Sequence, residues 1–126
     1  MTGGKKSEGL PLEANEVFMK LFDVAGKVHD SGEYILGARE TGSHACYLVY
    51  GALRPGEKGR EFRPGHGHEE LVLALCGDLR LTGNYDGTLR QGQALHLAGE
   101  ETVFAENIGD SQALYVIAGG HAGNHH

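Results

Sequence analysis

Pro64-Gly65-His66-Gly67-His68-Glu69-Glu70 leads directly into the apolar run Leu71-Val72-Leu73-Ala74-Leu75-Cys76, which Gly77 ends. The side chains of a β-strand point alternately to its two faces. A strand that begins near residue 66 therefore has one face of potential metal ligands followed by small side chains: His66, His68, Glu70, Val72, Ala74 and Cys76. The opposite face carries Leu71, Leu73 and Leu75, which suits packing against a sheet or a partner subunit. A continuous run of this kind predicts burial on both faces.

The rest of the chain favours an all-β domain. Glycine makes up 21 of the 126 residues, and it is scattered between short apolar runs, as many tight turns require. Short strands at regular spacing predict a sandwich or a barrel. We expect strands near 34–36, 44–53, 71–76, 79–82, 88–90, 94–97, 102–105 and 113–118. Residues 13–24 fit either a helical stripe or a strand, and we favour a strand after a short helical turn.

Length and composition limit the organisation and the partners. The chain is long enough for one domain, which we place at residues 13–118, between a flexible arm (1–12) and a flexible histidine-containing tail (119–126). Seventeen acidic against eleven basic residues give a net charge of −6, which argues against nucleic acid or an anionic membrane as the main partner. With neither a membrane-spanning run nor a secretory signal in the sequence, we expect a cytoplasmic protein.

The two cysteines give no support for redox chemistry. Cys46 and Cys76 each lie within an apolar run, and they do not form a Cys-x-x-Cys motif. We therefore expect two buried, reduced thiols.

The candidate ligand face predicts either a metal centre or an ordinary strand entrance. Two imidazoles and a carboxylate suit a divalent transition metal such as Fe, Mn, Ni, Zn or Cu. Gly65 and Gly67 would let the backbone bend so that both rings converge. The alternative is that His66 and His68 are exposed loop residues, with two edge charges behind them.

Residues 55–118 resemble the small single-domain cupins of the conserved-barrel type. The first cupin motif ends in a His, three residues, a Glu, six residues and a Gly, which His66, Glu70 and Gly77 reproduce. A weaker counterpart of the second motif runs from Gly92 to Gly99 and is followed by Asn107. The resemblance implies a double-stranded β-helix, or jelly-roll barrel, with a site in its lumen.

This chain departs from the cupin pattern at two ligand positions. The first histidine of the family's His-x-His falls on Pro64, and the histidine of the second motif falls on Thr102 or Val103. His68 is the candidate substitute for the first. His96 is the candidate for the second, because its neighbours Ala94 and Ala98 would give its strand a small-residue face like that of residues 72–76. The expected metal ligands are therefore His66, His68, Glu70 and His96.

The resemblance leaves several functions open. One is a metal-binding cupin acting on a small molecule, since related families include dioxygenases, isomerases and decarboxylases. A second is a non-catalytic module that binds a small ligand or a metal. A third is a structural barrel without metal, which forms a homodimer by the sheet contact common among cupins, with the leucine face of residues 71–75 at the interface. Whether the protein is an enzyme is left open.

Overall fold

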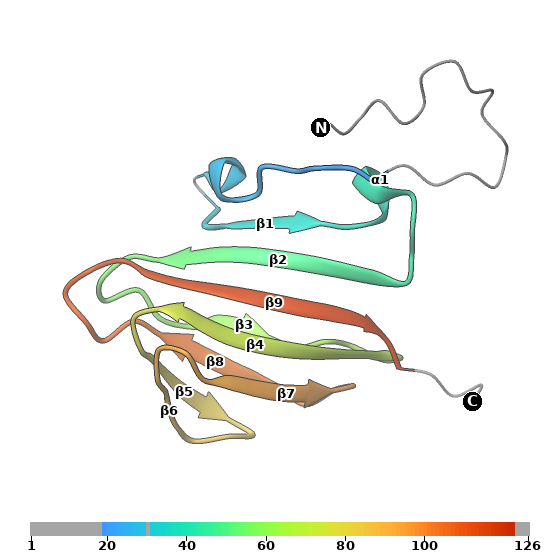
Figure 1. The fold of residues 1–126 in the computed structure, drawn as a ribbon. Coiled ribbons are helices and arrows are strands. Elements are labelled where there is room, and N and C mark those ends of the chain that lie inside the picture. The colour runs from blue at the N-terminus through green and yellow to red at the C-terminus, as the bar shows by residue number, and fades with distance from the viewer. Residues whose placement is uncertain (1–18, 30, 123–126) are drawn as a thin grey trace, which may run out of the picture.

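The computed structural model describes residues 19–29 and 31–122, and strands dominate them (Figure 1). Two short helices occur near the start of this part of the chain, a 3-10 turn at Ala25–Lys27 and α1 at Ala38–Thr41. The strands are β1 (Glu33–Leu36), β2 (Cys46–Leu53), β3 (Arg60–Phe62), β4 (His68–Cys76), β5 (Leu79–Gly83), β6 (Gly87–Leu89), β7 (Ala94–Ala98), β8 (Val103–Glu106) and β9 (Ala113–His121). The described residues therefore confirm the all-β fold class.

The strands form two antiparallel sheets that face each other. The five-stranded sheet has the order β1-β2-β9-β4-β7, and the four-stranded sheet has the order β3-β8-β5-β6. Neighbours in each sheet are mostly distant in sequence, so the chain winds repeatedly between the sheets, as expected for a jelly roll. Figure 1 shows the five-stranded sheet in front, with the second sheet behind its lower strands.

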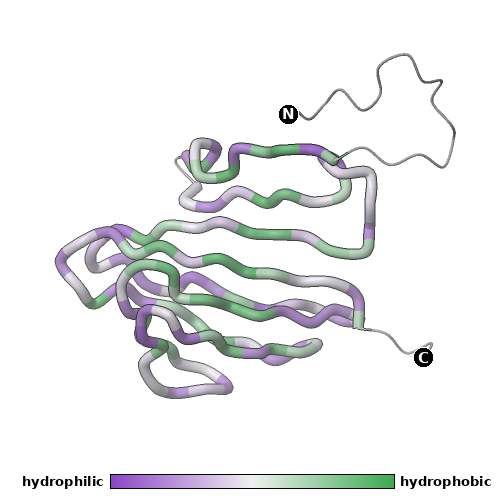
Figure 2. The backbone as a smooth tube through the Cα atoms, in the orientation of Figure 1, coloured by the Kyte–Doolittle hydropathy of each residue, from purple (hydrophilic) through white to green (hydrophobic). Residues whose placement is uncertain are grey.

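An apolar core fills the space between the sheets. Strand β4 shows how the sequence builds it, because Glu70, Val72 and Ala74 are buried while Glu69, Leu71 and Leu75 are exposed. Fully buried side chains come from both sheets, for example Leu53, Leu79, Leu81 and Val103. Figure 2 shows hydrophobic positions concentrated in the long strands β2, β9 and β4. The large side chains on the inner faces therefore hold the sheets together.

Several local predictions differ from the structure. Leu71 and Leu75 are about half exposed, so the 71–76 run is buried on one face only. Cys46 and Cys76 are both exposed, because Cys46 faces outward at the start of β2 and Cys76 follows a register shift in β4. Strand β9 continues to His121, beyond the end expected for the strand at residues 113–118. Residues 19–24 form no strand, and residues 1–18 lie outside the described part of the chain.

Candidate functional site

One end of the barrel carries polar side chains on the inner face of the five-stranded sheet. We call Tyr47, His68, Glu70 and His121 the mouth site. Strand β4 enters this end through a turn in which Gly65 and Gly67 both have positive φ, 95° and 80°. Glycine adopts this left-handed conformation without steric cost, so the turn can deliver His68 to the first position of the strand.

Two imidazoles lie side by side at the mouth. His68 on β4 is the register partner of His121 on β9, and their ring centroids are 4.8 Å apart with the planes tilted by 35°. His68 Nδ1 lies 3.1 Å from the carbonyl oxygen of His66. The backbone N–H of Ala122 donates to the carbonyl of Gly67 at 2.8 Å, which ties the end of β9 to the turn. The imidazole pair is therefore fixed by the backbone of two adjacent strands.

Glu70 is the buried carboxylate of the site, with 8% of its surface exposed. The hydroxyl of Tyr47 donates to its Oε2 at 2.6 Å. Tyr47 reaches it because the residue opposite on β9 is Gly119, where a Cβ would overlap the tyrosine ring. Within residues 19–29 and 31–122, this is the one hydrogen bond of the Glu70 side chain, although a carboxylate has about four acceptor positions.

The hydroxyl of Tyr47 holds its proton strongly. Burial raises the pKa of Tyr47 above its ordinary value, and the hydrogen bond to the Glu70 carboxylate raises it further. Both causes oppose formation of a second negative charge next to Glu70. Near neutral pH, Tyr47 is therefore a hydrogen-bond donor to Glu70.

Two of the four expected metal ligands lie away from the interior. His66 is exposed in the turn before β4. The expectation that His96 faces the lumen is wrong, because its Nε2 lies 2.8 Å from Glu69 Oε1 on the outer side of the sheet. On β7 the large residue Leu97 is buried in the core, so the small-residue face points outward. Because the larger leucine fills the core, His96 and the alanines of β7 face outward, which is the reverse of the expected orientation.

The described residues do not form a ready-made metal centre. Two imidazoles and a carboxylate would suit a borderline divalent metal. However, no three His, Cys, Asp or Glu side chains within the described ranges are grouped so that they could hold one ion. Behind the mouth the interior is filled by apolar side chains that include Val72, Leu97 and Ile117. The residues present therefore do not fit the expected four-ligand site.

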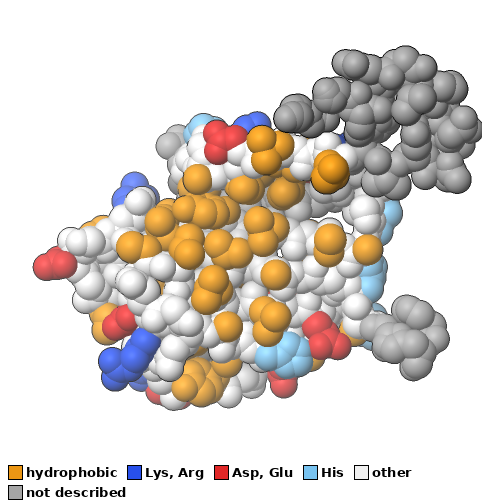
Figure 3. Space-filling view, in the orientation of Figure 1, with side chains coloured by type: hydrophobic (Ala, Val, Ile, Leu, Met, Phe, Trp, Pro, Cys, Tyr) orange, Lys and Arg blue, Asp and Glu red, His pale blue; other side chains and the backbone are white. Residues whose placement is uncertain are grey.

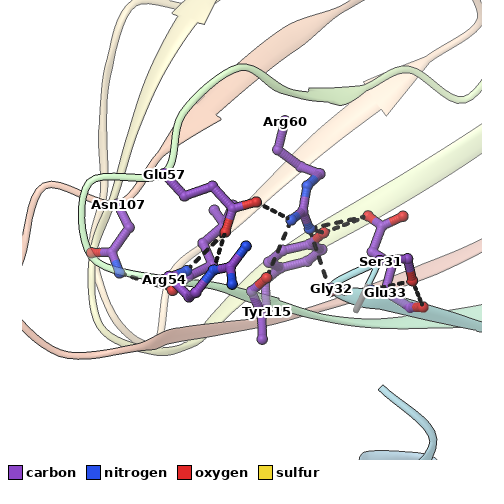
Figure 4. A network of polar contacts seen from close by, with 10 residues as sticks. Ser31, Gly32, Glu33, Arg54, Glu57, Arg60, Asn107 and Tyr115 are labelled. Atoms are coloured by element: carbon purple, nitrogen blue, oxygen red, sulfur yellow. Dashed lines mark hydrogen bonds and ion pairs between the residues drawn. The ribbon is translucent and has the colours of Figure 1, made fainter. Parts of the chain in front are cut away.

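A second polar network joins the two sheets on the flank where β1 and β2 approach β3 (Figure 4). Its centre is Arg60, whose side chain is 14% exposed. Arg60 Nη1 donates to the Tyr115 hydroxyl at 2.6 Å, and Nη2 donates to Glu57 Oε2 at 2.9 Å. The Tyr115 hydroxyl in turn donates to Glu33. Two further Arg60 contacts, at 3.4 and 3.3 Å, reach the carbonyl oxygens of Gly32 and Ala52.

The contacts of this network favour a charged Arg60 and a protonated Tyr115. Burial would lower the pKa of Arg60, but Tyr115, Glu57 and Glu33 together raise it. Burial also raises the pKa of Tyr115, as does its bond to Glu33. Because each partner is engaged by another, we interpret the network as a structural connection between the sheets.

Sequence reasoning found half of the mouth site. It placed His68 and Glu70 on one inner face, and the structure does so too. Tyr47 is not among the expected ligands, and His121 falls within the expected flexible tail (119–126). The available signal was the cross-strand pattern, since Tyr47 with Gly119 and Tyr115 with Gly51 both pair a tyrosine with a glycine on β2 and β9. That pattern is visible only once the register is known.

Comparisons with known proteins identify the fold. No protein-family model matches the sequence, and no curated protein matches it. Solved structures do match, and they include an uncharacterised double-stranded β-helix protein from Klebsiella pneumoniae. That protein is 14% identical with a TM-score of 0.65, over 82% of this chain and 91% of the other. The protein TT1209 from Thermus thermophilus is 18% identical with a TM-score of 0.62, over 82% and 98% of the two chains.

Oxalate oxidase in complex with the substrate analogue glycolate also matches, at 17% identity and a TM-score of 0.63. The match covers 86% of this chain and 62% of that one. At these identities the likeness defines the fold, which is the double-stranded β-helix of the cupins. The expected fold is therefore confirmed. None of the helices in residues 19–29 and 31–122 has the length and apolar character to cross a membrane.

Proposed function

We propose that the mouth site binds a small organic molecule that carries both a hydroxyl and a carboxylate group. The observation that carries this proposal is the buried carboxylate of Glu70, whose acceptor capacity is mostly unused by the described residues. A buried polar group without partners costs about 1–3 kcal/mol, and more if it is charged. A bound molecule that donates hydrogen bonds to Glu70 would recover that free energy.

The neighbouring side chains narrow the ligand class. Tyr47 already donates to one oxygen of Glu70, so a ligand hydroxyl would serve the other acceptor positions. His121 stands beside Glu70 on the same inner face and offers a ring N–H to an anionic oxygen, while Nδ1 of the neighbouring His68 is already directed at the carbonyl of His66. An α-hydroxy acid presents both groups. The fold match to oxalate oxidase in complex with glycolate supports this chemistry, because glycolate is a molecule of that class.

Glycolate is the probe that tests this proposal. Isothermal titration calorimetry of the full chain, after treatment with a chelator, should show one saturable site. Glu70→Gln and His121→Ala should abolish the signal, because each removes one half of the recognition. His96→Ala is the matched control, since it removes an imidazole on the outer side, and it should bind as the native protein does. Absence of a saturable signal for the native protein, or equal loss in His96→Ala, would contradict the proposal.

A divalent metal at the same mouth is the second candidate. The observation in its favour is the directly opposed pair His68 and His121 with Glu70 two positions along β4. Such a metal would supply a Lewis acid, and the imidazoles of His68 and His121 would hold it, since no third His, Cys, Asp or Glu side chain of the described residues is grouped with them. Titration of the chelator-treated protein with Zn²⁺ tests this: stoichiometric binding that His121→Ala removes and His96→Ala keeps would favour the metal over the metal-free site.

The homodimer expected from the leucine face is also part of our proposal. We propose that the outward side of the five-stranded sheet is covered by a second copy of this chain. Leu71 and Leu75 on that side are 51% and 42% exposed, although both are large and apolar. Exposed apolar patches of this kind commonly mark interaction sites.

A further inference from the structure

The outward side of the five-stranded sheet is a continuous apolar surface, which we call the outer face. The strand register arranges its side chains in rows that cross the sheet. One row contains Leu71, Ala118, Leu48 and Leu36, and the next contains Leu73, Val116, Tyr50 and Tyr34. Figure 3 shows the hydrophobic side chains gathered over these strands. A flat face built from such rows can pack against another sheet at about 10 Å.

The outer face carries both a protrusion and a hollow. Leu71 protrudes from β4 and has half of its surface exposed. Beside it lies a shallow, open hollow of about 340 Å³, which is lined on β9 by Ala118, Gly119 and Gly120. Glu69, Glu70 and Leu71 line it on β4, and His96 lines it on β7. The hollow exists because β9 has an alanine and two glycines next to a leucine and a glutamate on β4.

The charge of this face also favours a second copy over a charged partner. The chain has a net charge of −6, yet Glu69 is the one Asp, Glu, Lys or Arg side chain that points outward from the five strands of this sheet. That carboxylate lies 2.8 Å from His96 Nε2. Two copies can therefore approach face to face without bringing their excess negative charge together.

A two-fold axis would match the protrusion to the hollow. In a two-fold dimer the same surface is used by both copies, so the surface must be complementary to itself. Leu71 and Ala118 are direct register partners on neighbouring strands. An axis that passes close to this pair places Leu71 of each copy over the small residues of the other, so both insertions occur at once.

From this geometry we propose that Leu71 of each copy inserts into the hollow over Ala118, Gly119 and Gly120 of the other copy. This inference rests on the proposed homodimer, and it adds the residue contact that sets how the two faces align. In this position the half-exposed side chain of Leu71 would lose its contact with water, and burial of apolar surface favours association.

Sedimentation velocity of the full chain over a concentration series tests both the homodimer and the Leu71 insertion. We expect the native protein to be a dimer. Leu71→Ala removes the protrusion and Ala118→Leu fills the hollow, so each variant alone should raise the dimer dissociation constant about tenfold or more, as loss of a central contact does. Phe104→Ala is the matched control, because Phe104 is 40% exposed and lies in the other sheet, and it should dimerise like the native protein. Far-UV circular dichroism verifies that each variant is folded.

Mixing the two variants gives the decisive result. In a mixed dimer, the leucine introduced by Ala118→Leu in one chain meets the space that Leu71→Ala has left in the other chain. That contact of the mixed dimer then has neither a clash nor an empty space. In the two homodimers, by contrast, every such contact has either a clash (Ala118→Leu) or an empty space (Leu71→Ala). The mixture should therefore form heterodimers more tightly than the Ala118→Leu and Leu71→Ala variants form homodimers. A native dimer whose variants show no such preference would overturn the Leu71 insertion while leaving the homodimer. A native protein that is monomeric at all concentrations would overturn both.

Discussion

Tyr115 lies across Gly51, its direct partner on the adjacent strand β2. The tyrosine ring occupies the space in which a Cβ at position 51 would stand, and it packs against Phe62 with ring centroids 4.8 Å apart. The same relationship recurs four residues away along β2, where Tyr47 lies across Gly119. In both cases the glycine lets a tyrosine extend sideways along the inner face and reach a carboxylate.

Gly51→Ala should therefore destabilise the protein. The added Cβ overlaps the Tyr115 ring, and overpacking of a filled core costs roughly 1–3 kcal/mol. Urea denaturation of both proteins measures this loss. Gly37→Ala is the control, because a Cβ there has its nearest neighbour at an ordinary 3.8 Å, and its stability should stay near that of the native protein. Equal midpoints for Gly51→Ala and the native chain would contradict the close approach.

Arg60→Ala should destabilise the flank between the sheets. The substitution leaves Glu33, Glu57 and the Tyr115 hydroxyl without their shared cation. Removal of one partner from a fully buried ion pair costs roughly 3–5 kcal/mol, and the partial exposure of both carboxylates reduces our expectation to about 2 kcal/mol. Chemical denaturation provides the measurement. Arg63→Ala, whose side chain is 49% exposed, is the matched control and should cost much less.

Asn107→Ala should lower the stability of the protein, because the Asn107 side chain links neighbouring loop segments by hydrogen bonds. The Asn107 side chain is buried, and its Nδ2 donates to the carbonyls of Leu53 at 3.0 Å and Ser111 at 2.8 Å. Its Oδ1 accepts from the N–H of Gly109 at 2.9 Å. Loss of these bonds leaves the buried carbonyl of Leu53 unpaired, at about 1–3 kcal/mol, so we expect a loss of about 2 kcal/mol in thermal or urea unfolding. A loss below about 0.5 kcal/mol would contradict this role, since that is the size of an ordinary surface substitution.

Stability should fall in alkaline solution because of Tyr47 and Tyr115. The pKa of each is raised in the folded protein, so the unfolded chain releases these protons first as the pH passes about 10. Their contribution is therefore complete below that pH and is lost as the pH rises further. Urea midpoints at about pH 8 and pH 11, on either side of the ordinary tyrosine pKa, should differ less for Tyr47→Phe than for the native protein. Tyr85→Phe, at an exposed position, is the control and should behave like the native chain.

The sequence predicted the strands and the jelly roll because their determinants are local. Alternation and turn glycines lie within each segment, so β2, β4 and β9 could be located without a structure. The orientation of His96 could not be predicted in this way. Leu95 and Leu97 face the core because burial of their larger apolar side chains is more favourable than burial of the alanines of β7, and this turns His96 outward. The prediction that Cys46 and Cys76 are buried was wrong for a related reason, since apolar neighbours in the sequence do not reveal which side of a sheet is covered.

The candidate site was harder to predict than the fold because half of it comes from distant strands. His68 and Glu70 are two residues apart, and their common face follows from the period of a strand. Tyr47 and His121 join them only through the pairing of β2 and β4 with β9, across many residues of chain. One sequence carries no direct record of that register.

Strand β9 lies between β2 and β4 at the centre of the five-stranded sheet, although it follows the other eight strands of residues 19–29 and 31–122 in sequence. During synthesis on the ribosome, β2 and β4 therefore leave the exit tunnel before residues 113–121 have been made. Until then, the edges that pair with β9 stay unpaired. Pairings this distant in sequence close late and make folding slow. A nascent chain stalled before Ala113 would expose the edges of β2 and β4 to other nascent chains, so chaperones that shield such edges should matter most in that interval of synthesis.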